Sequence, residues 1–344
     1  MADRKSAYAQ AGVNIDVKMN AVGSIKQMVA ATKTQNVLGG IGSFGGLFKV
    51  PAGKDRILVA STDGVGTKLK VAAMMNKHDT VGQDIVNHCV NDILVQGATP
   101  LFFMDYVGTA KVDPQVFKSV VSGLCRACKE NRMALLGGET AEMPGLYPAG
   151  EYDLVGTIVG SVPRSKLVTG KSIRAGDVII GFPSGGLQTN GFSLARRVIF
   201  DLCQYSWKDK LPGTNQTFGD ALLAVHKSFL KPVMALMAQV KINGMAHITG
   251  GGFQDNLPRV MPAAVNAEID RASWEVPTIF RFIERQGKVD RDEMYRVFNM
   301  GIGFVVIIAK RDLKKATNIL RAAHQPYRVI GVMRKGSGVV TYKN

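Results

Sequence analysis

The chain has 344 residues, with 43 Lys and Arg against 27 Asp and Glu, which gives a formal net charge of +16. A hydrophobic content of 46% is typical of a globular protein with buried cores, and the length suffices for two domains. Four cysteines are too few for a disulfide framework at this size, and no apolar run approaches the roughly 20 residues that span a bilayer. The first residues show no apolar stretch typical of a signal peptide, so we expect a cytoplasmic protein without a membrane partner.

The first half of the chain alternates predicted strands and helices. Strands are expected at 57–62, 102–108, 133–137 and 152–162, and helices at 80–96 and 114–130, each opened by a polar cap. Cys125 and Cys128 form a C-x-x-C pair late in the second helix, whereas a redox pair would lie at a helix N-terminus. We therefore interpret both as ordinary helix residues.

A polar segment at 162–177, with proline and glycine, is the best candidate for a domain boundary. It predicts domains at 1–168 and 169–344. The second half contains expected strands at 178–182, 246–249, 303–309, 327–333 and 338–342, and expected helices at 191–203, 218–239, 277–286 and 311–323. The predicted fold class is mixed α/β (α+β) in two halves.

The glycines Gly40, Gly42 and Gly45 satisfy the pattern G-x-G-x-x-G. A dinucleotide-binding turn follows a strand and opens a helix, but here a strand-like segment ending at Pro51 follows instead. A mobile glycine flap and a plain disordered loop are equal alternatives.

The stretch "STDGVGTK" follows a predicted strand at residues 61–68. Gly64 and Gly66 allow a turn that presents N–H groups, and Lys68 next to Thr67 supplies a charge suited to phosphate. Asp63 would repel phosphate unless a divalent cation stood between them, which suggests Mg²⁺ and a nucleotide. A tight turn capped by Asp63 explains this stretch alone equally well.

Further carboxylates at the ends of elements favour the nucleotide interpretation. Asp84, His88 and Asp92 fall on one stripe of the helix at 80–96, where a solvated face is the plain interpretation for Asp84 and His88. Asn91 and Asp92 precede a turn, and Asp105 lies within an apolar run, where an acid is costly unless paired or bound to metal. Another group of glycines and acidic or polar residues lies at and after the end of the strand at 133–137: Gly137, Gly138, Glu139, Thr140 and Glu142.

Small polar residues and glycines recur between strands and helices of the second half. Such a turn before a helix is suited to a phosphate group, although each turn alone is more simply structural. Together they suggest a second anionic ligand. The residues are Ser184, Gly185, Gln188, Thr189, Asn190, Gly191, His247, Thr249, Gly250, Gly251, Gly252 and Asn299.

These motifs resemble one family along nearly the whole chain. The phrases "STDGVGTK", "CVNDILVQGATPLFFMDY", "GGETAEMPG", "HITGGGFQDNLPRV" and "MYRVFNMGIG" are similar to those of the phosphoribosylformylglycinamidine cyclo-ligases, or AIR synthetases. The first and third are shared in looser form by thiamine-monophosphate kinases and selenophosphate synthetases. The resemblance implies an ATP-dependent ligase of purine biosynthesis that closes formylglycinamidine ribonucleotide (FGAM) to aminoimidazole ribonucleotide (AIR), releasing ADP and phosphate.

The resemblance also implies two domains, a homodimer whose N-terminal sheets close into a barrel, and a C-terminal sheet with packed helices. ATP and Mg²⁺ are the implied cofactors, with Asp63, Asp92, Asp105 and Glu142 around the metal. Catalytic roles are implied for Lys68, Asp105 and His247. The nucleotide would contact the glycine flap, the turn at 63–68, Asn91, Asp92 and residues 137–140, while the second-half turns would bind the substrate.

Gln188 departs from the family phrase, which has histidine at that position, so an acid/base role there is in doubt. Two alternatives remain. A sister phosphoryl-transfer enzyme of the superfamily would lack the "HITGGG" and "FNMGIG" pair. A nucleic-acid-binding protein would explain the charge of +16 but not the carboxylates, and the basic residues are scattered rather than clustered.

Overall fold

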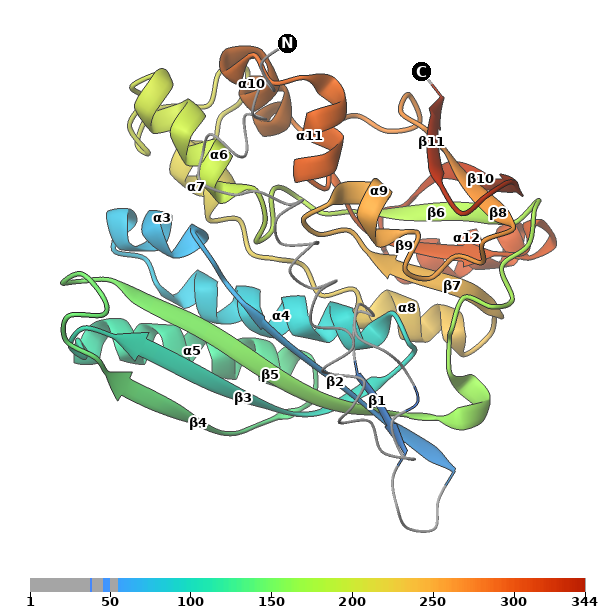
Figure 1. Ribbon diagram of the computed structural model, residues 1–344, viewed down its shortest axis with the longest axis horizontal. Coiled ribbons are helices and arrows are strands. Elements are labelled where there is room, and N and C mark those ends of the chain that lie inside the picture. Colours follow the sequence, from blue (N-terminus) through green and yellow to red (C-terminus); the bar gives the residue numbers. More distant parts are fainter. Residues whose placement is uncertain (1–37, 39–45, 50–54, 344) are drawn as a thin grey trace.

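Two sheets with helices packed against them form the architecture (Figure 1). The computed structural model describes residue 38, residues 46–49 and residues 55–343. The mixed α/β class predicted from the sequence is confirmed, whereas the predicted flap with Gly40, Gly42 and Gly45 lies outside the described residues. Within the described part, no helix has the length and apolar character needed to span a bilayer.

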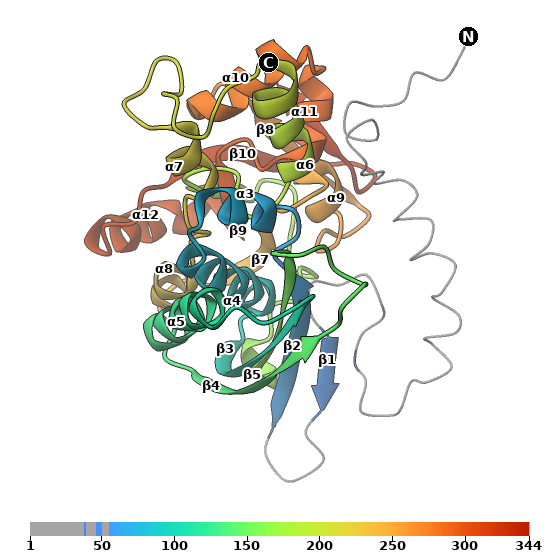
Figure 2. The ribbon, with the colours of Figure 1, turned by 90° about the vertical axis from the view of Figure 1, so that its left-hand side faces the viewer.

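The N-terminal sheet has five strands in the order β1-β2-β5-β3-β4. All neighbours pair antiparallel except β3 and β4, which are parallel. The helices α4 and α5 lie on the same side of this sheet (Figures 1 and 2). The elements are β1 (Gly46–Lys49), β2 (Arg56–Gly64), α3 (Lys68–Met75), α4 (Asp79–Leu94), β3 (Thr99–Thr109), α5 (Pro114–Glu130), β4 (Ala134–Glu142) and β5 (Tyr152–Pro163).

Both α4 and α5 were predicted close to their observed bounds, but only α5 has the predicted polar cap, since the residue before α4, His78, makes no capping hydrogen bond through its side chain. The side chain of Asp113 accepts hydrogen bonds from the backbone N–H groups of Gln115 and Val116 at 2.8 and 3.2 Å, and Pro114 occupies the first helical position. The two helices approach closely at glycines: a Cβ on Gly82 would lie 2.2 Å from the Val120 carbonyl oxygen. The cysteines of α5 and the other two are free, as expected.

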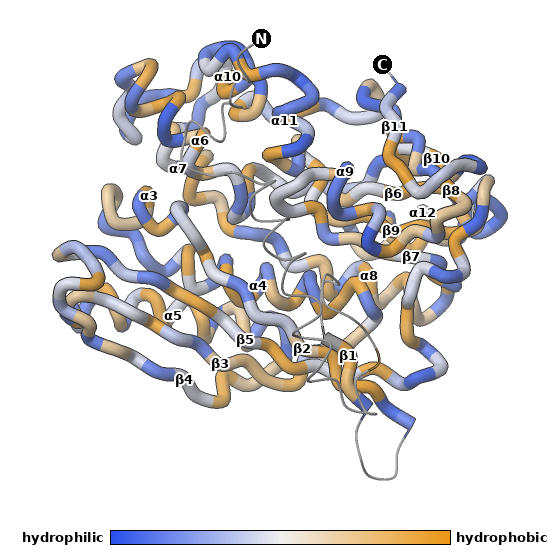
Figure 3. Tube along the Cα trace, viewed as in Figure 1, coloured by the Kyte–Doolittle hydropathy of each residue, from blue (hydrophilic) through white to orange (hydrophobic). Residues whose placement is uncertain are grey.

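The C-terminal sheet has six strands in the order β11-β8-β10-β6-β9-β7, and β11 with β8 is its parallel pair. Its inner strand β9 is buried along its whole length, and hydrophobic stretches are visible along β9 and β7 in Figure 3. The elements are β6 (Val178–Pro183), α6 (Phe192–Arg196), the π-helical turn Arg197–Leu202, α7 (Phe218–Leu222), α8 (Leu230–Met237), β7 (Ile242–His247), α9 (Gly252–Asn256), β8 (Val265–Asp270), α10 (Thr278–Gly287), α11 (Arg291–Val297), β9 (Ile302–Ile308), α12 (Leu313–Ala322), β10 (Arg328–Lys335) and β11 (Val340–Lys343), with 3₁₀ turns at Arg164–Lys166 and Lys310–Asp312.

The single helix predicted at 218–239 was wrong. The chain forms α7 and α8 with a non-helical loop at 223–229, because side chains of α4 bind that loop's backbone. Asp84 accepts a hydrogen bond from the His226 N–H at 2.7 Å, and Asn91 accepts one from the Phe229 N–H at 2.9 Å. Pro232 also lacks the N–H that a helix continuing from residue 228 would need. The helices α3 and α11 and the strand β8 were not predicted.

The helix α4 lies between the two halves and is buried on all sides from Thr80 to Leu94. One stripe packs on β2 and β5, while its polar stripe faces loops of the C-terminal half. A solvated face was therefore the wrong interpretation for Asp84 and His88: Asp84 has no exposed surface and His88 is 4% exposed. The polar residues of this helix join the two halves.

Candidate functional site

Five titratable side chains from both halves meet beside α4, and we call them the histidine–aspartate cluster: Asp63, His88, Asp92, His226 and His247. Asp63 lies at the end of β2, His88 and Asp92 lie one turn apart on α4, His226 precedes α8, and His247 ends β7. Asp63 is 46% exposed at its side chain, whereas the other four are buried. The cluster is thus reached from solvent at Asp63.

Short contacts link the members of the cluster. The Nε2 atom of His88 lies 2.9 Å from Asp63 Oδ2 and 3.7 Å from Asp92 Oδ2. His247 Nδ1 lies 2.8 Å from Asp92 Oδ1, and its Nε2 lies 3.1 Å from His226 Nε2. His88, Asp92 and His247 each offer a ligand atom within 4.8 Å of the other two, which makes them a candidate metal site.

The surrounding charges and burial shift the pKa values of the three histidines in different directions. Burial alone would lower the pKa of His88, but Asp63, Asp92 and Asp84 outweigh it and raise that pKa to about 9. Burial lowers the pKa of His247 although Asp92 acts in the opposite direction. Burial and the neighbouring His247 lower the pKa of His226 well below its ordinary value. The carboxylates therefore concentrate negative potential around His88.

Lys68, predicted as a phosphate ligand, is fully buried and forms an ion pair with Asp84 at 2.7 Å. Its ammonium also donates to the carbonyl oxygens of Gln188 at 3.1 Å and Ala224 at 2.8 Å. Burial lowers the pKa of Lys68 and raises that of Asp84, each partly offset by the partner's charge. All three donors of the ammonium have acceptors, so this placement does not support a contact between Lys68 and phosphate.

The neighbours of Lys68 in the turn lie nearer to solvent. Asp63 Oδ1 accepts a hydrogen bond from the Gly64 N–H at 2.7 Å, as in a capped turn. Gly66 has a φ of +69°, and the Thr67 hydroxyl lies 3.1 Å from that of Ser193 on α6. The turn therefore bridges the two halves at the exposed edge of the cluster.

The structure brings together Asp63 and Asp92 but not the other two predicted metal ligands. Asp63 and Asp105 both pair in register with Gly156, so β5 separates them, by about 9.5 Å at two strand spacings. Burial raises the pKa of Asp105. Glu142 pairs with Thr109, farther along β3, and accepts a hydrogen bond from the Val112 N–H at 2.7 Å. Within one described chain, these four carboxylates cannot chelate one ion.

The predicted nucleotide residues of β4 lie beside Asp105. A Cβ on Gly138 would lie 2.4 Å from Asp105 Oδ1, so the missing side chain makes room for that carboxylate. Gly137 has open space at its Cβ position. Glu139 accepts a hydrogen bond from the Thr140 N–H at 2.7 Å. The group thus forms a second acidic region, separate from the histidine–aspartate cluster.

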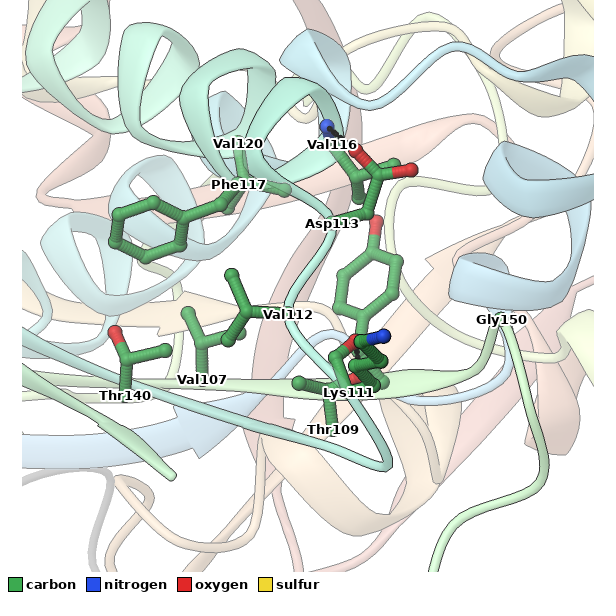
Figure 4. Close-up of a pocket in the computed structure, with 11 residues that line it drawn as sticks. Val107, Thr109, Lys111, Val112, Asp113, Val116, Phe117, Val120, Thr140 and Gly150 are labelled. Carbon is green, nitrogen blue, oxygen red and sulfur yellow. Dashed lines mark hydrogen bonds between the residues drawn. The ribbon is translucent and has the colours of Figure 1, made fainter. Parts of the chain in front are cut away.

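A hollow between α5 and the sheet lies next to this region (Figure 4). Val107 and Thr109 of β3, Phe117 of α5 and Thr140 of β4 line it. The lining is mainly apolar, and of the predicted site residues only Thr140 belongs to it. It does not include the histidine–aspartate cluster.

The loop at 184–191 and the turn before β9 form one hydrogen-bonded unit. The Ser184 hydroxyl lies 2.9 Å from Asn299 Oδ1, and the Asn299 amide donates to the carbonyl oxygens of Gly186 and Leu187 at 3.0 and 3.2 Å. The polar atoms of the Ser184 and Asn299 side chains therefore take part in hydrogen bonds that fix the conformation of the loop. Gly185 has a φ of +82° and lies against the Lys227 side chain.

Gln188, which replaces the family histidine, is 2% exposed and has a φ of 62°. Neither polar atom of its side-chain amide has a hydrogen-bond partner among the described residues. A buried amide without partners is costly, so its position suits a ligand group that would satisfy it. The neighbouring Thr189 hydroxyl lies 2.8 Å from His88 Nδ1, which joins this loop to the cluster.

The glycine turn at 249–252 faces the same loop. A Cβ on Gly250 would lie 3.1 Å from Asn190 Oδ1, and Gly191 begins α6 with a φ of +78°. The Thr249 hydroxyl donates to Asn256 Oδ1 at 3.3 Å, Gly251 caps the short helix α9, and Gly252 is its first residue. The predicted substrate-binding turns of the second half therefore lie side by side.

Sequence reasoning missed His226, Lys227 and Arg259. Burial lowers the pKa values of Lys227 and Arg259, and the charges of Asp92 and Asp63 act on Arg259, which places that guanidinium near the cluster. Arg259 lies within the phrase "HITGGGFQDNLPRV" that resembles the family, so the sequence could have indicated it as a site residue. His226 and Lys227 lie in a segment predicted as helix, so no signal distinguished them.

Comparison with known sequences identifies the relatives of this chain. The sequence models for AIR synthase related proteins match it twice: the N-terminal domain at residues 44–162 and the C-terminal domain at residues 174–343. The chain belongs to the AIR synthase related family. The domain boundary predicted at residue 168 falls between the two matches and stays a prediction.

Relatives within the AIR synthase related family align over nearly the full chain. The phosphoribosylformylglycinamidine cyclo-ligase of Alkaliphilus metalliredigens is 47% identical over 339 residues, 98% of each chain. That of Thermoanaerobacter pseudethanolicus is 50% identical over 333 residues, 97% of this chain and 99% of the relative.

Solved structures share the fold at low sequence identity. Thiamine-monophosphate kinase from Aquifex aeolicus superimposes with a TM-score of 0.62 at 14% identity, covering 96% of this chain and 98% of the other. The hydrogenase maturation protein HypE in complex with ATP gives 0.61 at 17% identity, covering 86% and 83%. At these identities the likeness shows the fold alone.

Proposed function

We propose that this protein is an ATP-dependent cyclo-ligase that converts FGAM to AIR and releases ADP and phosphate. The observation that carries the proposal is the set of relatives named phosphoribosylformylglycinamidine cyclo-ligase, which are 45–50% identical over nearly the whole length. The two matched family domains agree with it. No feature of the cluster favours a thiamine phosphate or selenide substrate.

ATP is the proposed phosphoryl donor, and Mg²⁺ is its proposed partner ion. Mg²⁺ binds through one or two carboxylates together with phosphate oxygens and water, and the half-exposed Asp63 fits that requirement. When bound, Mg²⁺ would neutralise the charge on the transferred phosphoryl group. Asp105 and Glu142 lie too far along the sheet to share that ion with Asp63 in one chain.

The reaction proposed here joins two steps. The γ-phosphoryl group of ATP passes to the formyl oxygen of FGAM, and the amidine nitrogen then attacks the activated carbon and displaces phosphate. Such transfer depends on positioning and charge more than on a nucleophile of the protein. The chain would contribute the backbone N–H groups of Gly66 and Thr67 and the polar loops that hold the substrate.

For substrate binding we propose the adjoining loops at 184–191 and 247–252. The amide of Gln188 would gain the partners that it lacks among the described residues, and Lys227 beside Gly185 would provide a positive charge near a ribose phosphate. Since glutamine cannot take up a proton, Gln188 would bind and orient rather than act as acid or base. Proton transfer would fall to another group.

A homodimer is also proposed, formed through the face of the N-terminal sheet opposite α4 and α5. Phe48, Leu101, Met104 and Leu136 from this sheet are 38–63% exposed. Exposed apolar residues on a sheet indicate an interaction surface. Analytical ultracentrifugation of the Met104→Lys variant tests this proposal, because a charge on this face should weaken the dimer. A variant that dimerises with the same dissociation constant as the wild type would contradict the proposal. Cytoplasmic localisation remains a prediction from the sequence.

The decisive experiment measures phosphate release from ATP with FGAM, thiamine phosphate and selenide offered separately. We expect release only with FGAM, accompanied by formation of AIR. Release with thiamine phosphate or selenide would instead assign the protein to a sister activity. A filter-binding assay with a salt titration tests nucleic acid, for which we expect no specific retention.

A further inference from the structure

The histidine–aspartate cluster contains a hydrogen-bond arrangement that neutral histidines and ionised carboxylates do not satisfy. Asn91 fixes the starting point. Its Oδ1 accepts from the Phe229 N–H at 2.9 Å and its Nδ2 donates to the Lys227 carbonyl at 2.7 Å, so the orientation of the amide is determined. The same Nδ2 lies 3.1 Å from His226 Nε2, which must therefore be an acceptor.

The remaining protons follow from that assignment. The proton of neutral His226 lies on Nδ1, directed at the Thr189 hydroxyl oxygen at 3.3 Å. Because His226 Nε2 accepts, the Nε2 atom of His247, 3.1 Å away, carries a proton. Neutral His247 then directs the lone pair of Nδ1 at Asp92 Oδ1, 2.8 Å away. Two electron-rich atoms at that distance require a cation between them.

A proton could be that cation, but it would make His247 an imidazolium with no exposed surface. A metal ion satisfies every neighbour with neutral histidines. It would take the lone pairs of His247 Nδ1 and His88 Nε2, while His88 would carry its proton on Nδ1, 2.8 Å from the Thr189 hydroxyl oxygen. Ligating histidines in proteins characteristically donate their second ring N–H to such a partner.

The candidate ligand atoms lie within reach of one metal ion, because His88, Asp92 and His247 each offer an atom within 4.8 Å of the other two. Ligands at 2.0–2.2 Å in a tetrahedron lie roughly 3.3–3.6 Å apart. The separation of 3.7 Å from His88 to Asp92 is close to that range, whereas the contact of 2.8 Å from His247 to Asp92 is shorter and would lengthen when a metal ion binds. These three side chains are buried, and the half-exposed Asp63, 2.9 Å from His88 Nε2, lies at the entry to the site.

We propose that His88, Asp92 and His247 form a binding site for a divalent transition-metal ion of the zinc type, with Asp63 at its solvent-facing side. Imidazole ligands favour such ions over Mg²⁺, which prefers oxygen ligands. The site is distinct from the Mg²⁺ of the proposed function, which Asp63 would bind, because two of its three ligands are nitrogen atoms. Asp63 borders both, so the ion would lie next to the bound nucleotide.

The test measures metal binding directly and does not depend on turnover. Full-length protein without a polyhistidine tag is stripped with EDTA and titrated with Zn²⁺ in excess Mg²⁺ by calorimetry, with metal content verified by mass spectrometry. We expect one Zn²⁺ per chain. Co²⁺ in its place should give visible d–d absorption without the thiolate charge-transfer bands that a cysteine site would produce.

The variant His88→Gln should weaken Zn²⁺ binding by more than the roughly 10–100-fold typical of outer-shell changes. His324→Gln is the matched control, because His324 is exposed and follows α12, and it should bind as the wild type does. Asp63→Asn provides a second test at a half-exposed position that should tolerate change, and it should weaken binding at least tenfold. Absence of Zn²⁺ binding in the wild type, or unchanged binding in both His88→Gln and Asp63→Asn, would overturn the proposal.

Discussion

The buried pair Lys68–Asp84 yields the sharpest prediction, because its placement changes the expected role of Lys68 from ligand binding to stability. Replacing Lys68 with Met removes one partner and leaves the carboxylate of Asp84 charged and without exposed surface. Removal of one partner from a buried pair costs about 3–5 kcal/mol of unfolding free energy. The carbonyls of Gln188 and Ala224 also lose their donor, which places the expected cost in the upper part of that range.

The double variant Lys68→Met with Asp84→Asn identifies the source of that cost. Asparagine retains the oxygen that accepts from the His226 N–H but carries no charge. We therefore expect the double variant to recover about 2 kcal/mol relative to Lys68→Met alone. If the two variants are equally unstable, the unpaired charge is not the cause.

The control is Lys70→Met, two residues farther along α3. Lys70 pairs with Glu151 at the surface, with side chains 41% and 33% exposed, so its loss should cost about 0–1 kcal/mol. Urea unfolding at pH 7, followed by far-UV circular dichroism and by tryptophan fluorescence, measures all the variants. Equal stability of Lys68→Met and Lys70→Met, with a raised KM for ATP only in the former, would restore the phosphate role and refute our reasoning.

Three further predictions test the packing, the site and the thiols. Gly123→Ala places a Cβ 2.0 Å from the Asp79 carbonyl oxygen, so we expect a loss of about 1–3 kcal/mol in thermal unfolding; an unchanged melting temperature would contradict the close approach of α4 and α5. Asp63→Asn should reduce FGAM-dependent ATP turnover roughly 100-fold or more while circular dichroism stays unchanged, and near-normal turnover would remove Asp63 from the nucleotide site. Iodoacetamide at pH 8 should label the exposed Cys125 but not Cys128, because burial raises the pKa of Cys128 to about 12 and leaves roughly one thiol in 10⁴ ionised; peptide mapping that finds both labelled would contradict the burial of Cys128.

The sequence was a good guide where local signals and tertiary packing agree. The helix at 114–130 was predicted to the residue because Asp113 and Pro114 mark its start and its apolar stripe has helical spacing. The prediction failed at 218–239, where the backbone of residues 226–229 binds side chains of α4 some 140 positions earlier in the chain. Such pairing leaves no local pattern in the sequence.

The candidate site shows the same division. Motifs located Asp63, Asp92 and His247, which the structure brings together. They could not show that Lys68 is neutralised by Asp84, because a lysine beside glycines has the same sequence pattern whether it faces phosphate or the interior. His88 was interpreted as part of a solvated stripe. The sequence of the helix alone does not indicate that loops of the second half of the chain cover that stripe.

The burial of α4 between the two halves has a consequence for how ligands enter and leave. Separating the halves would expose the polar stripe of α4, and Asp84 and Asn91 would lose the backbone N–H groups that they bind in the C-terminal half. A motion of that size cannot accompany each turnover. Nucleotide, substrate and products must therefore enter and leave along the edge of the cluster at Asp63 and the loops facing it, while α4 stays fixed between the two halves.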